Sequence, residues 1–313
     1  MANALKFDLA RPRLCYRQWM LAGNPAYFFD HLARHCGDFI HYRGLFSFYF
    51  VNHPELVKQV LTGTNKTLDK HTVIYDRFRE AFGDGLVVAE GEQWTRKRRL
   101  MQPMFSPSTI HGFFETLLCA AEKMVAHWET RCHEQTVFDV AHDMEQVTLR
   151  IAGEVLFSDG FDDASERIAS WTSAINRYSA KPPLPILRQP WFPSRTNLQL
   201  KRTLREFHAF IGNLIEQRRQ SPQSNDLLTT LLQSQQGEDG KAIGDHEIKE
   251  EVLGMIIGGH ETSSSALTWI WYELHRNPEA QQRLREEIEL VVGKEKLTID
   301  HLPQLTYTRM VVD

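Results

Sequence analysis

The feature that most constrains the fold is the segment from Asp245 to Arg276, whose pattern predicts one long helix. Asp245 is a candidate N-cap, and Asn277-Pro278 ends the segment because the residue before a proline avoids helical backbone. A helix of this span is roughly 45–50 Å long at about 1.5 Å per residue. Because that length crosses a whole domain, we expect the middle of the helix to be buried.

Residues that do not favour a buried helix gather at its middle, where residues 258–263 are GGHETS. Two glycines in a helix cost about 1 kcal/mol each relative to alanine, and a buried Glu261 costs more unless it is paired or hydrated. The Thr262 hydroxyl can bond back to the Gly258 carbonyl. This clustering predicts a site where a flat ligand or small molecule lies against Gly258 and Gly259, while Glu261 and Thr262 relay protons through water.

The same segment admits two other interpretations. The glycines could instead mark a contact with a crossing helix, with Glu261 reaching solvent, and the residues alone leave that alternative open. The pair His260-Glu261 also resembles the start of the zinc motif H-E-x-x-H. Ser264 stands where the second histidine is needed, so the zinc interpretation fails.

A second cluster is the run WTRKRR at residues 94–99. Trp94 and Arg98 are four residues apart and share one face of a helix. An indole N–H and a guanidinium both donate hydrogen bonds, which suits a planar ligand that carries carboxylates. The alternative is a solvated basic face, or a targeting or nucleic-acid patch. A net charge of −4 and the lack of any other basic cluster argue against a nucleic-acid partner.

The rest of the pattern predicts a mainly α protein with a small N-terminal β-hairpin. The hairpin spans residues 38–43 and 45–51 with a turn at Gly44, and Pro54 opens a short helix that ends near Gly63. Prolines exclude a helix from residue 181 to 194, and residues 234–244 form a polar connector. Helices are expected over residues 26–35, 92–101, 108–134, 141–157, 164–179, 197–220, 225–234, 245–276 and 278–292.

Composition limits the class of protein further. A hydrophobic share of 42% is enough for a buried core. No stretch approaches the about 20 apolar residues of a membrane span, and residues 1–10 do not resemble a signal peptide, so we expect a cytoplasmic protein. The cysteines form no C-x-x-C pair and are expected to be buried free thiols. They are Cys15, Cys36, Cys119 and Cys132.

Both clusters resemble motifs of the cytochrome P450 family, the haem-thiolate monooxygenases. Residues 258–263 match the pattern [AG]-G-x-[DE]-T-[TS] of the family's central helix, and Trp94 and Arg98 match the W-x-x-x-R of its haem-propionate helix. Residues 85–106, Asp226-Leu227-Leu228 and Asn277-Pro278 are similar as well. The resemblance covers nearly all 313 residues, so we expect residues 1–313 to belong to a single P450-like domain.

The resemblance implies a role for each residue of the two motifs. Trp94 and Arg98 bind a haem propionate, and the haem lies against Gly258 and Gly259. Thr262 forms a hydrogen bond to dioxygen, while Glu261 helps to resupply protons for cleavage of the O–O bond.

The resemblance also implies a substrate pocket and partners. A loop from about His71 to Glu90 lines the pocket through Phe78, Phe82, Leu86 and Val87, and the proline-rich segment 181–194 lies over the substrate entrance. The implied substrate is small and either lipid-like or otherwise apolar. The sequence holds no flavin or iron–sulfur motif, so electrons come from a separate partner protein.

One departure from the family lies near the C-terminus. Residues 302–307 resemble the segment before the family's E-x-x-R motif, and the chain stops at Asp313, about where that motif is expected. The motif F-x-x-G-x-R-x-C-x-G, whose cysteine thiolate binds iron, is not in the sequence. Phe29, Arg34 and Cys36 have its spacing, but Leu32 and Asp38 replace its glycines. We therefore expect no metal ligand in this chain, which would be the N-terminal two-thirds of the domain.

The departure leaves three hypotheses. The first is a fragment of a monooxygenase, active only as part of the complete protein. The second is a non-catalytic helical protein that binds an apolar ligand, and the third is one half of a split monooxygenase. In each case the long helix is expected to expose a large apolar face. The chain alone is expected not to form a stable thiolate–haem enzyme, which the reduced carbon monoxide spectrum tests.

Overall fold

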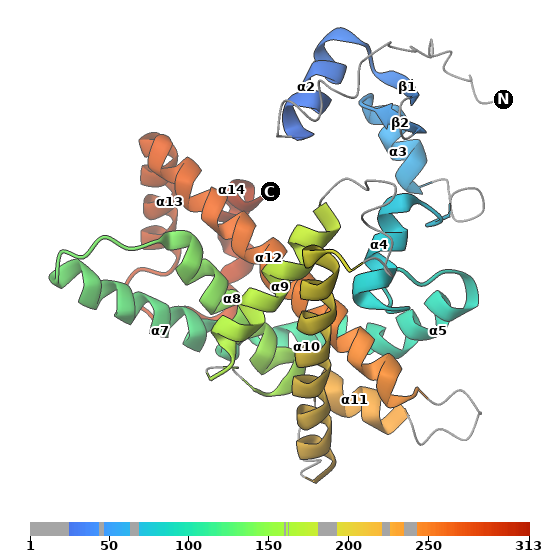
Figure 1. Ribbon diagram of the computed structural model, residues 1–313. Coiled ribbons are helices and arrows are strands. Elements are labelled where there is room, and N and C mark those ends of the chain that lie inside the picture. The colour runs from blue at the N-terminus through green and yellow to red at the C-terminus, as the bar shows by residue number, and fades with distance from the viewer. Residues whose placement is uncertain are drawn as a thin grey trace. The chain divides into compact units, whose positions relative to one another are not determined.

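The computed structural model describes residues 25–43, 47–62, 69–159, 161, 163–180, 193–220, 226–234 and 243–313 (Figure 1). Two compact units divide the chain, Met1–Asp69 and Lys70–Asp313. Both consist mainly of helices, and the described residues contain one two-stranded sheet. The expectation of a mainly α fold with a small N-terminal hairpin is therefore confirmed.

The first unit is a hairpin with two helices. Helix α2 (Pro25–His35) is followed by strands β1 (Phe39–Arg43) and β2 (Ser47–Val51), which pair antiparallel, and by helix α3 (Pro54–Thr62). Alternating side chains place Ile40 and Tyr42 on the face that packs against Phe28 and Leu32 of α2. The Phe28 and Tyr42 rings meet edge to face at 5.6 Å. The predicted turn at Gly44 lies outside the described residues.

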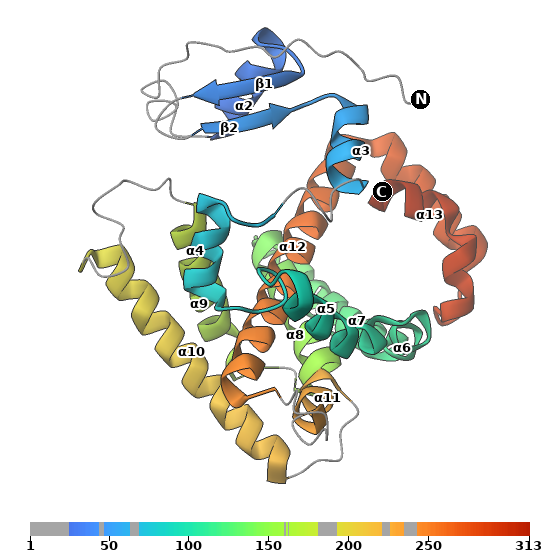
Figure 2. The same ribbon diagram turned by 90° about the vertical axis from the view of Figure 1, so that its right-hand side faces the viewer.

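The second unit is built around one long helix, α12 (Asp245–Arg276), which Figures 1 and 2 show in orange. Its main neighbour is α8 (Val140–Phe157). Leu149 and Ala152 of α8 and Val252 and Ile256 of α12 lie in one buried apolar cluster. The other elements are α4 (Val73–Phe82), α5 (Gly91–Met101), η1 (Gln102–Phe105), α6 (Pro107–Gly112), α7 (Phe114–His133), α9 (Ser165–Ala180), α10 (Arg195–Gln220), α11 (Leu227–Gln233), α13 (Pro278–Val291), η3 (Ile299–Gln304) and α14 (Thr306–Val312).

The predicted bounds of α12 are confirmed, but its N-cap is not Asp245. Gly244 has the extended backbone of an N-cap, and its N–H donates to the Glu247 Oε2 at 3.4 Å. Asp245 is the first residue of the helix, where a negative charge is favourable to the helix dipole. Its carboxylate accepts a hydrogen bond from Arg219 of α10 at 2.6 Å.

The middle of α12 is buried on one side only, which corrects the expectation of general burial. Ile256, Ile257 and His260 are buried, whereas Gly258 and Thr262 are exposed. Neighbouring helices, α8 above all, cover the buried side. The second half of α12 exposes the expected apolar face, in which Trp269 has 62% of its surface accessible. The other exposed members of this face are Leu267, Trp271 and Tyr272.

Two segments were predicted wrongly. The single helix expected over 108–134 is divided into α6 and α7, because Phe113, at φ −88° and ψ −1°, stays in the right-handed region but lies far from the ψ of about −42° of a regular helix. The loop expected from His71 to Glu90 contains helix α4. Thr72 caps α4 by accepting a hydrogen bond from the Tyr75 N–H at 3.3 Å, and Gly83 ends it at φ +63°. The other predicted helices are confirmed to within two residues.

The remaining expectations are met only in part. Cys119 and Cys132 are free but exposed, and Cys36 is half-buried, so burial was wrong for these three thiols. Cys15, residues 181–192 of the proline-rich segment and residues 235–242 of the polar connector lie outside the described residues. Among the helices that the structure describes, none has the length and apolar character to cross a membrane.

Candidate functional site

The centre of α12 has an open side at Gly258 and Thr262. The Thr262 hydroxyl donates a hydrogen bond to the Gly258 carbonyl at 2.7 Å, which confirms the predicted back-bond. A Cβ added to Gly258 would meet no atom within 4 Å. Because this bond uses the only hydroxyl proton, the lone pairs of the Thr262 oxygen remain available as acceptors on the exposed side of the helix.

Val87 lies on the same side of α12 as these two residues. Gly254, Gly258 and Thr262 follow one another at intervals of four residues, so they form a row along one face of the helix. A Cβ added to Gly254 would lie 3.7 Å from the Val87 Cγ2. Val87 keeps 46% of its surface accessible. The structure therefore brings one expected pocket residue next to the glycine–threonine row.

Gly259 has a different neighbour from Gly258. A Cβ added to Gly259 would lie 3.7 Å from the Cβ of Ala152, so Gly259 lies where α12 crosses α8. At the same crossing the His260 Nδ1 and the Thr148 hydroxyl are 3.1 Å apart, and burial lowers the pKa of His260. Gly259 thus contacts the crossing helix α8, whereas Gly258 faces open space, and the binding of a ligand at either glycine stays a prediction.

Glu261 is half-buried and lines a pocket rather than the open side of α12. The pocket has a volume of about 410 Å³ and lies between α8, α9 and α12. Burial raises the pKa of Glu261, and the nearby Glu145 of α8 raises it further. Thr262 is not among the lining residues, so the acid and the alcohol of the motif face different surroundings.

The predicted propionate-binding pair lies on α5, which ion pairs attach to α12. Lys97 is buried, and its ammonium is 2.7 Å from the Glu251 carboxylate; Arg96 is 2.7 Å from the Glu247 carboxylate. The basic run is therefore not a uniformly solvated face. Trp94 and Arg98 are exposed, and among the described residues Arg98 has no ion-pair partner. This leaves the guanidinium of Arg98 available to an anionic group.

The acidic residues at the start of α12 were not predicted to have a role. Glu251 accepts a hydrogen bond from the Leu86 N–H at 2.9 Å, while Lys97 also donates to the Asp84 carbonyl at 2.7 Å. Gly83 has φ +63°, which favours glycine, and a Cβ there would lie 1.7 Å from the Glu250 carboxylate, which would have to move. Burial raises the pKa of Glu250. Acids in successive turns of one helix face were the available signal, but their partners are distant in sequence.

The other expected pocket residues are more enclosed than Val87. Phe82 is buried in the apolar core of the second unit, and Phe78 and Leu86 are partly buried against that core. The rings of Phe78 and Phe82 meet edge to face at 5.7 Å. Their contact with a substrate stays a prediction, as do the roles of Trp94, Arg98, Gly258, Gly259, Glu261 and Thr262.

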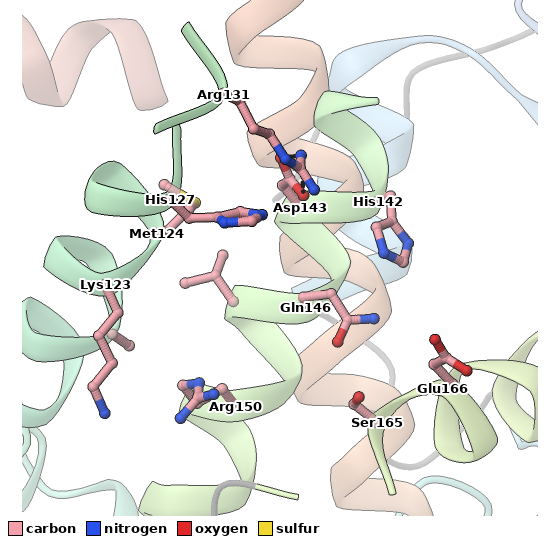
Figure 3. Close-up of a pocket in the computed structure, with 12 residues that line it drawn as sticks. Lys123, Met124, His127, Arg131, His142, Asp143, Gln146, Arg150, Ser165 and Glu166 are labelled. Carbon is pink, nitrogen blue, oxygen red and sulfur yellow. Dashed lines mark hydrogen bonds and ion pairs between the residues drawn. The ribbon is translucent and has the colours of Figure 1, made fainter. Parts of the chain in front are cut away.

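A separate pocket of about 320 Å³ lies between α7, α8 and the start of α9 (Figure 3). It contains none of the expected site residues. Figure 3 shows Arg131 of α7 reaching Asp143 of α8, at 2.9 Å, and Trp128 donates to the same carboxylate at 2.7 Å. These bonds satisfy a buried carboxylate and fix α7 on α8.

Comparisons with known proteins agree with the motifs. The sequence matches the family model for cytochrome P450 over residues 12–313. It is 34% identical to pentalenene oxygenase from Streptomyces avermitilis, over 94% of this chain and 65% of that protein. It is 31% identical to cyclooctat-9-en-7-ol 5-monooxygenase from Streptomyces melanosporofaciens, over 92% of this chain and 62% of that protein. It is also 27% identical to the human ultra-long-chain fatty acid omega-hydroxylase, over 83% of this chain and 53% of that protein.

The chain spans less than two-thirds of the length of these relatives. The match to the family model nevertheless covers almost the whole chain and includes both motifs. The chain belongs to the cytochrome P450 family, whose members are haem-dependent monooxygenases.

Proposed function

We propose that this chain carries the oxygen-side and propionate-binding parts of a haem site in a monooxygenase that oxidises an apolar substrate. The observation that carries this proposal is the open face of α12, where Gly254, Gly258 and Thr262 form a row beside Val87. A row without bulky side chains suits a flat ring or a small molecule that lies against backbone. The hydroxyl at its end supplies the polar contact.

The residues of the second unit fit a haem on two counts. Gly258 has open space where a side chain would stand, and the exposed donors of Trp94 and Arg98 suit the carboxylates of the ring. The family's cysteine motif is not in the sequence, so the proposal concerns the ring and its propionates and not the iron ligand. When bound, haem supplies the iron at which dioxygen is reduced.

In this proposal the chain's own residues position groups and hold protons. Thr262, fixed by its bond to Gly258, presents its oxygen to the small molecule on the open face. Glu261 lies in the neighbouring pocket between α8, α9 and α12, where burial raises its pKa, and is proposed to serve as a proton carrier from there. Val87 places an apolar side chain beside the glycine row, which favours an apolar substrate there.

The substrate class and partners are part of the same proposal. The names of the relatives specify pentalenene, cyclooctat-9-en-7-ol and ultra-long-chain fatty acids, so we expect a substrate with a large hydrocarbon portion. A separate electron-transfer protein is proposed as the electron donor. We also propose a cytoplasmic location.

Hemin titration of the purified chain, followed by the Soret absorption, tests the propionate assignment. Arg98→Leu is expected to weaken hemin binding about tenfold or more, because a charge-assisted hydrogen bond contributes roughly 1.5–3 kcal/mol. Arg99→Leu is the matched control, since Arg99 is an exposed arginine of the same helix. Equal affinities for the two variants would contradict the assignment.

Gly258→Leu tests the open face in the same titration. The leucine would occupy the space beside Thr262, so hemin binding should be lost, whereas Gly112→Leu on α6 places the same side chain in open space elsewhere. Unchanged binding by the Gly258 variant would refute the proposed position of the ring. Tight binding of a fatty acid without any hemin binding would favour the apolar-ligand binding protein instead.

A further inference from the structure

The pocket between α7, α8 and the start of α9 is lined mostly by side chains that carry hydrogen-bond donors. Residues four apart share one face of a helix, so α7 and α8 each present a row of side chains to the pocket. The row on α7 is Lys123, His127 and Arg131, and the row on α8 is His142, Gln146 and Arg150. Figure 3 shows the two rows on neighbouring helices, with Ser165 and Glu166 of α9 beside them.

Most of these donors have no partner within the part of the chain that the structure describes. Lys123, His127, His142 and Gln146 make no hydrogen bond or ion pair there. Arg131 gives both of its bonds to Asp143 through Nη1, at 3.2 and 2.9 Å, so its Nε and Nη2 donate to no described residue. A ligand that supplies several acceptor atoms at once would therefore find its donors already gathered in one pocket.

The charges in the pocket favour an anion over a cation. The carboxylate of Asp143 is already neutralised by Arg131 at 2.9 Å. Of the other permanently charged groups that line the pocket, Lys123 and Arg150 are cations and only Glu166 is an anion. The pocket therefore keeps an excess of positive charge even when both histidines are uncharged.

The size and the apolar part of the pocket indicate what the anion carries. Its volume of about 320 Å³ is at the lower end of the range of small-molecule sites, about 300–1,000 Å³. Ala120, Met124 and Val147, which belong to the apolar contact between α7 and α8, also line it. The pocket thus combines a polar rim with an apolar floor, which suits an anionic group on a small organic molecule.

The number of donors distinguishes between the common anionic groups. A carboxylate offers two oxygens, whereas a phosphomonoester offers three terminal oxygens that are strong acceptors. Five side chains with unused donors, contributed by two helices, exceed what two oxygens of one plane receive. The donor set therefore fits a phosphate group better than a carboxylate.

We propose that the pocket between α7 and α8 is a binding site for a small phosphomonoester. Lys123 and Arg131 contribute charge, and His127, His142 and Gln146 contribute further donors to the phosphate oxygens. The organic portion lies on the apolar floor. Binding involves no covalent step, and the site shares no residue with the proposed haem site.

Nuclear magnetic resonance of the 313-residue chain labelled with ¹⁵N-histidine tests this proposal with glycerol 3-phosphate as the probe. His127→Gln and His142→Gln identify the ring signals of these residues by their loss. Both signals should shift in a saturable way as the probe is added at constant ionic strength. Glycerol without phosphate should leave them unchanged.

Lys123→Glu should weaken binding of the probe at least about tenfold, because it replaces an attractive charge by a repulsive one. Lys201→Glu is the matched control, since Lys201 is an exposed lysine of α10 that does not line the pocket. His133→Gln, an exposed histidine of α7 outside the pocket, is the control for His127→Gln. Far-UV circular dichroism checks that each variant is folded.

Vesicles of phosphatidylcholine with phosphatidic acid distinguish a lipid headgroup from a free phosphomonoester. Binding to these vesicles that Lys123→Glu abolishes, without a response to glycerol 3-phosphate, would support the site with a lipid as the source of the phosphate. If neither probe shifts the two histidine signals, or if Lys123→Glu and Lys201→Glu weaken binding equally, the proposal is overturned.

Discussion

The attachment of α5 to α12 depends on a buried charge whose removal should be costly. Lys97 and Glu251 each keep only 1% of their side-chain surface accessible, and their charged groups are 2.7 Å apart. Lys97→Met preserves most of the length of the side chain, but among the described residues it leaves the Glu251 carboxylate with only the Leu86 N–H as a donor. Removing one partner of a buried ion pair typically costs about 3–5 kcal/mol. That is a large part of the about 5–15 kcal/mol that stabilises a domain.

Urea unfolding followed by far-UV circular dichroism measures this cost. Arg96→Met is the matched control, because the Arg96–Glu247 pair has 28% and 33% of its side chains accessible and should contribute only about 0–1 kcal/mol. The double variant Lys97→Met with Glu251→Gln should lose less stability than the sum of the two single variants, since it leaves no unpaired buried charge. A loss for Lys97→Met no larger than for Arg96→Met, or an additive double variant, would refute the reasoning.

Three further predictions concern α8, α12 and α13. Gly153→Ala should lower the free energy of unfolding by about 1–3 kcal/mol, because the alanine Cβ would lie 2.1 Å from a backbone carbonyl oxygen. Gly112→Ala is the control in urea unfolding, since a Cβ at Gly112 meets no atom within 4 Å. Partial desolvation raises the pKa of Glu287, but hydrogen bonds from backbone amides and hydroxyls of α14 outweigh it and hold the pKa at about 2. The hydrogen bonds that attach α14 to Glu287 should therefore be complete above about pH 4.5 and be lost toward pH 2. At neutral pH, Glu287→Gln should weaken the same attachment, which faster amide hydrogen exchange in α14 would show. Because burial lowers the pKa of His260, the free energy of unfolding should fall as the pH drops below about 6.5. His260→Gln should make the free energy of unfolding less dependent on pH in this range, and an unchanged pH dependence would contradict the prediction.

The long helix shows what local sequence can and cannot predict. Its bounds follow from Asn277-Pro278 and from a pattern that no proline interrupts, and both signals are local. The one-sided burial of its middle depends on which helices cover it, and the pattern GGHETS does not contain that information. For the same reason the glycines could not be told apart in advance, although Gly258 faces open space and Gly259 faces Ala152.

Long-range pairing explains most of the remaining errors. Arg96 and Lys97 were assigned to a basic run, since their partners Glu247 and Glu251 are far away in the sequence. Helix α4 was predictable in principle, because Thr72 and Gly83 are ordinary cap residues at its two ends. The helix was not predicted because the resemblance to the family implied a loop over residues 71–90.

The ion pairs at the start of α12 have a mechanical consequence. Helix α12, which carries Thr262, is bound to α5 through the Glu251–Lys97 ion pair. Glu251 also accepts a hydrogen bond from the backbone N–H of Leu86. We therefore expect any displacement of α12 to carry Arg98 and Val87 with it, so that the spacing among the Thr262 hydroxyl, the Arg98 guanidinium and Val87 changes little.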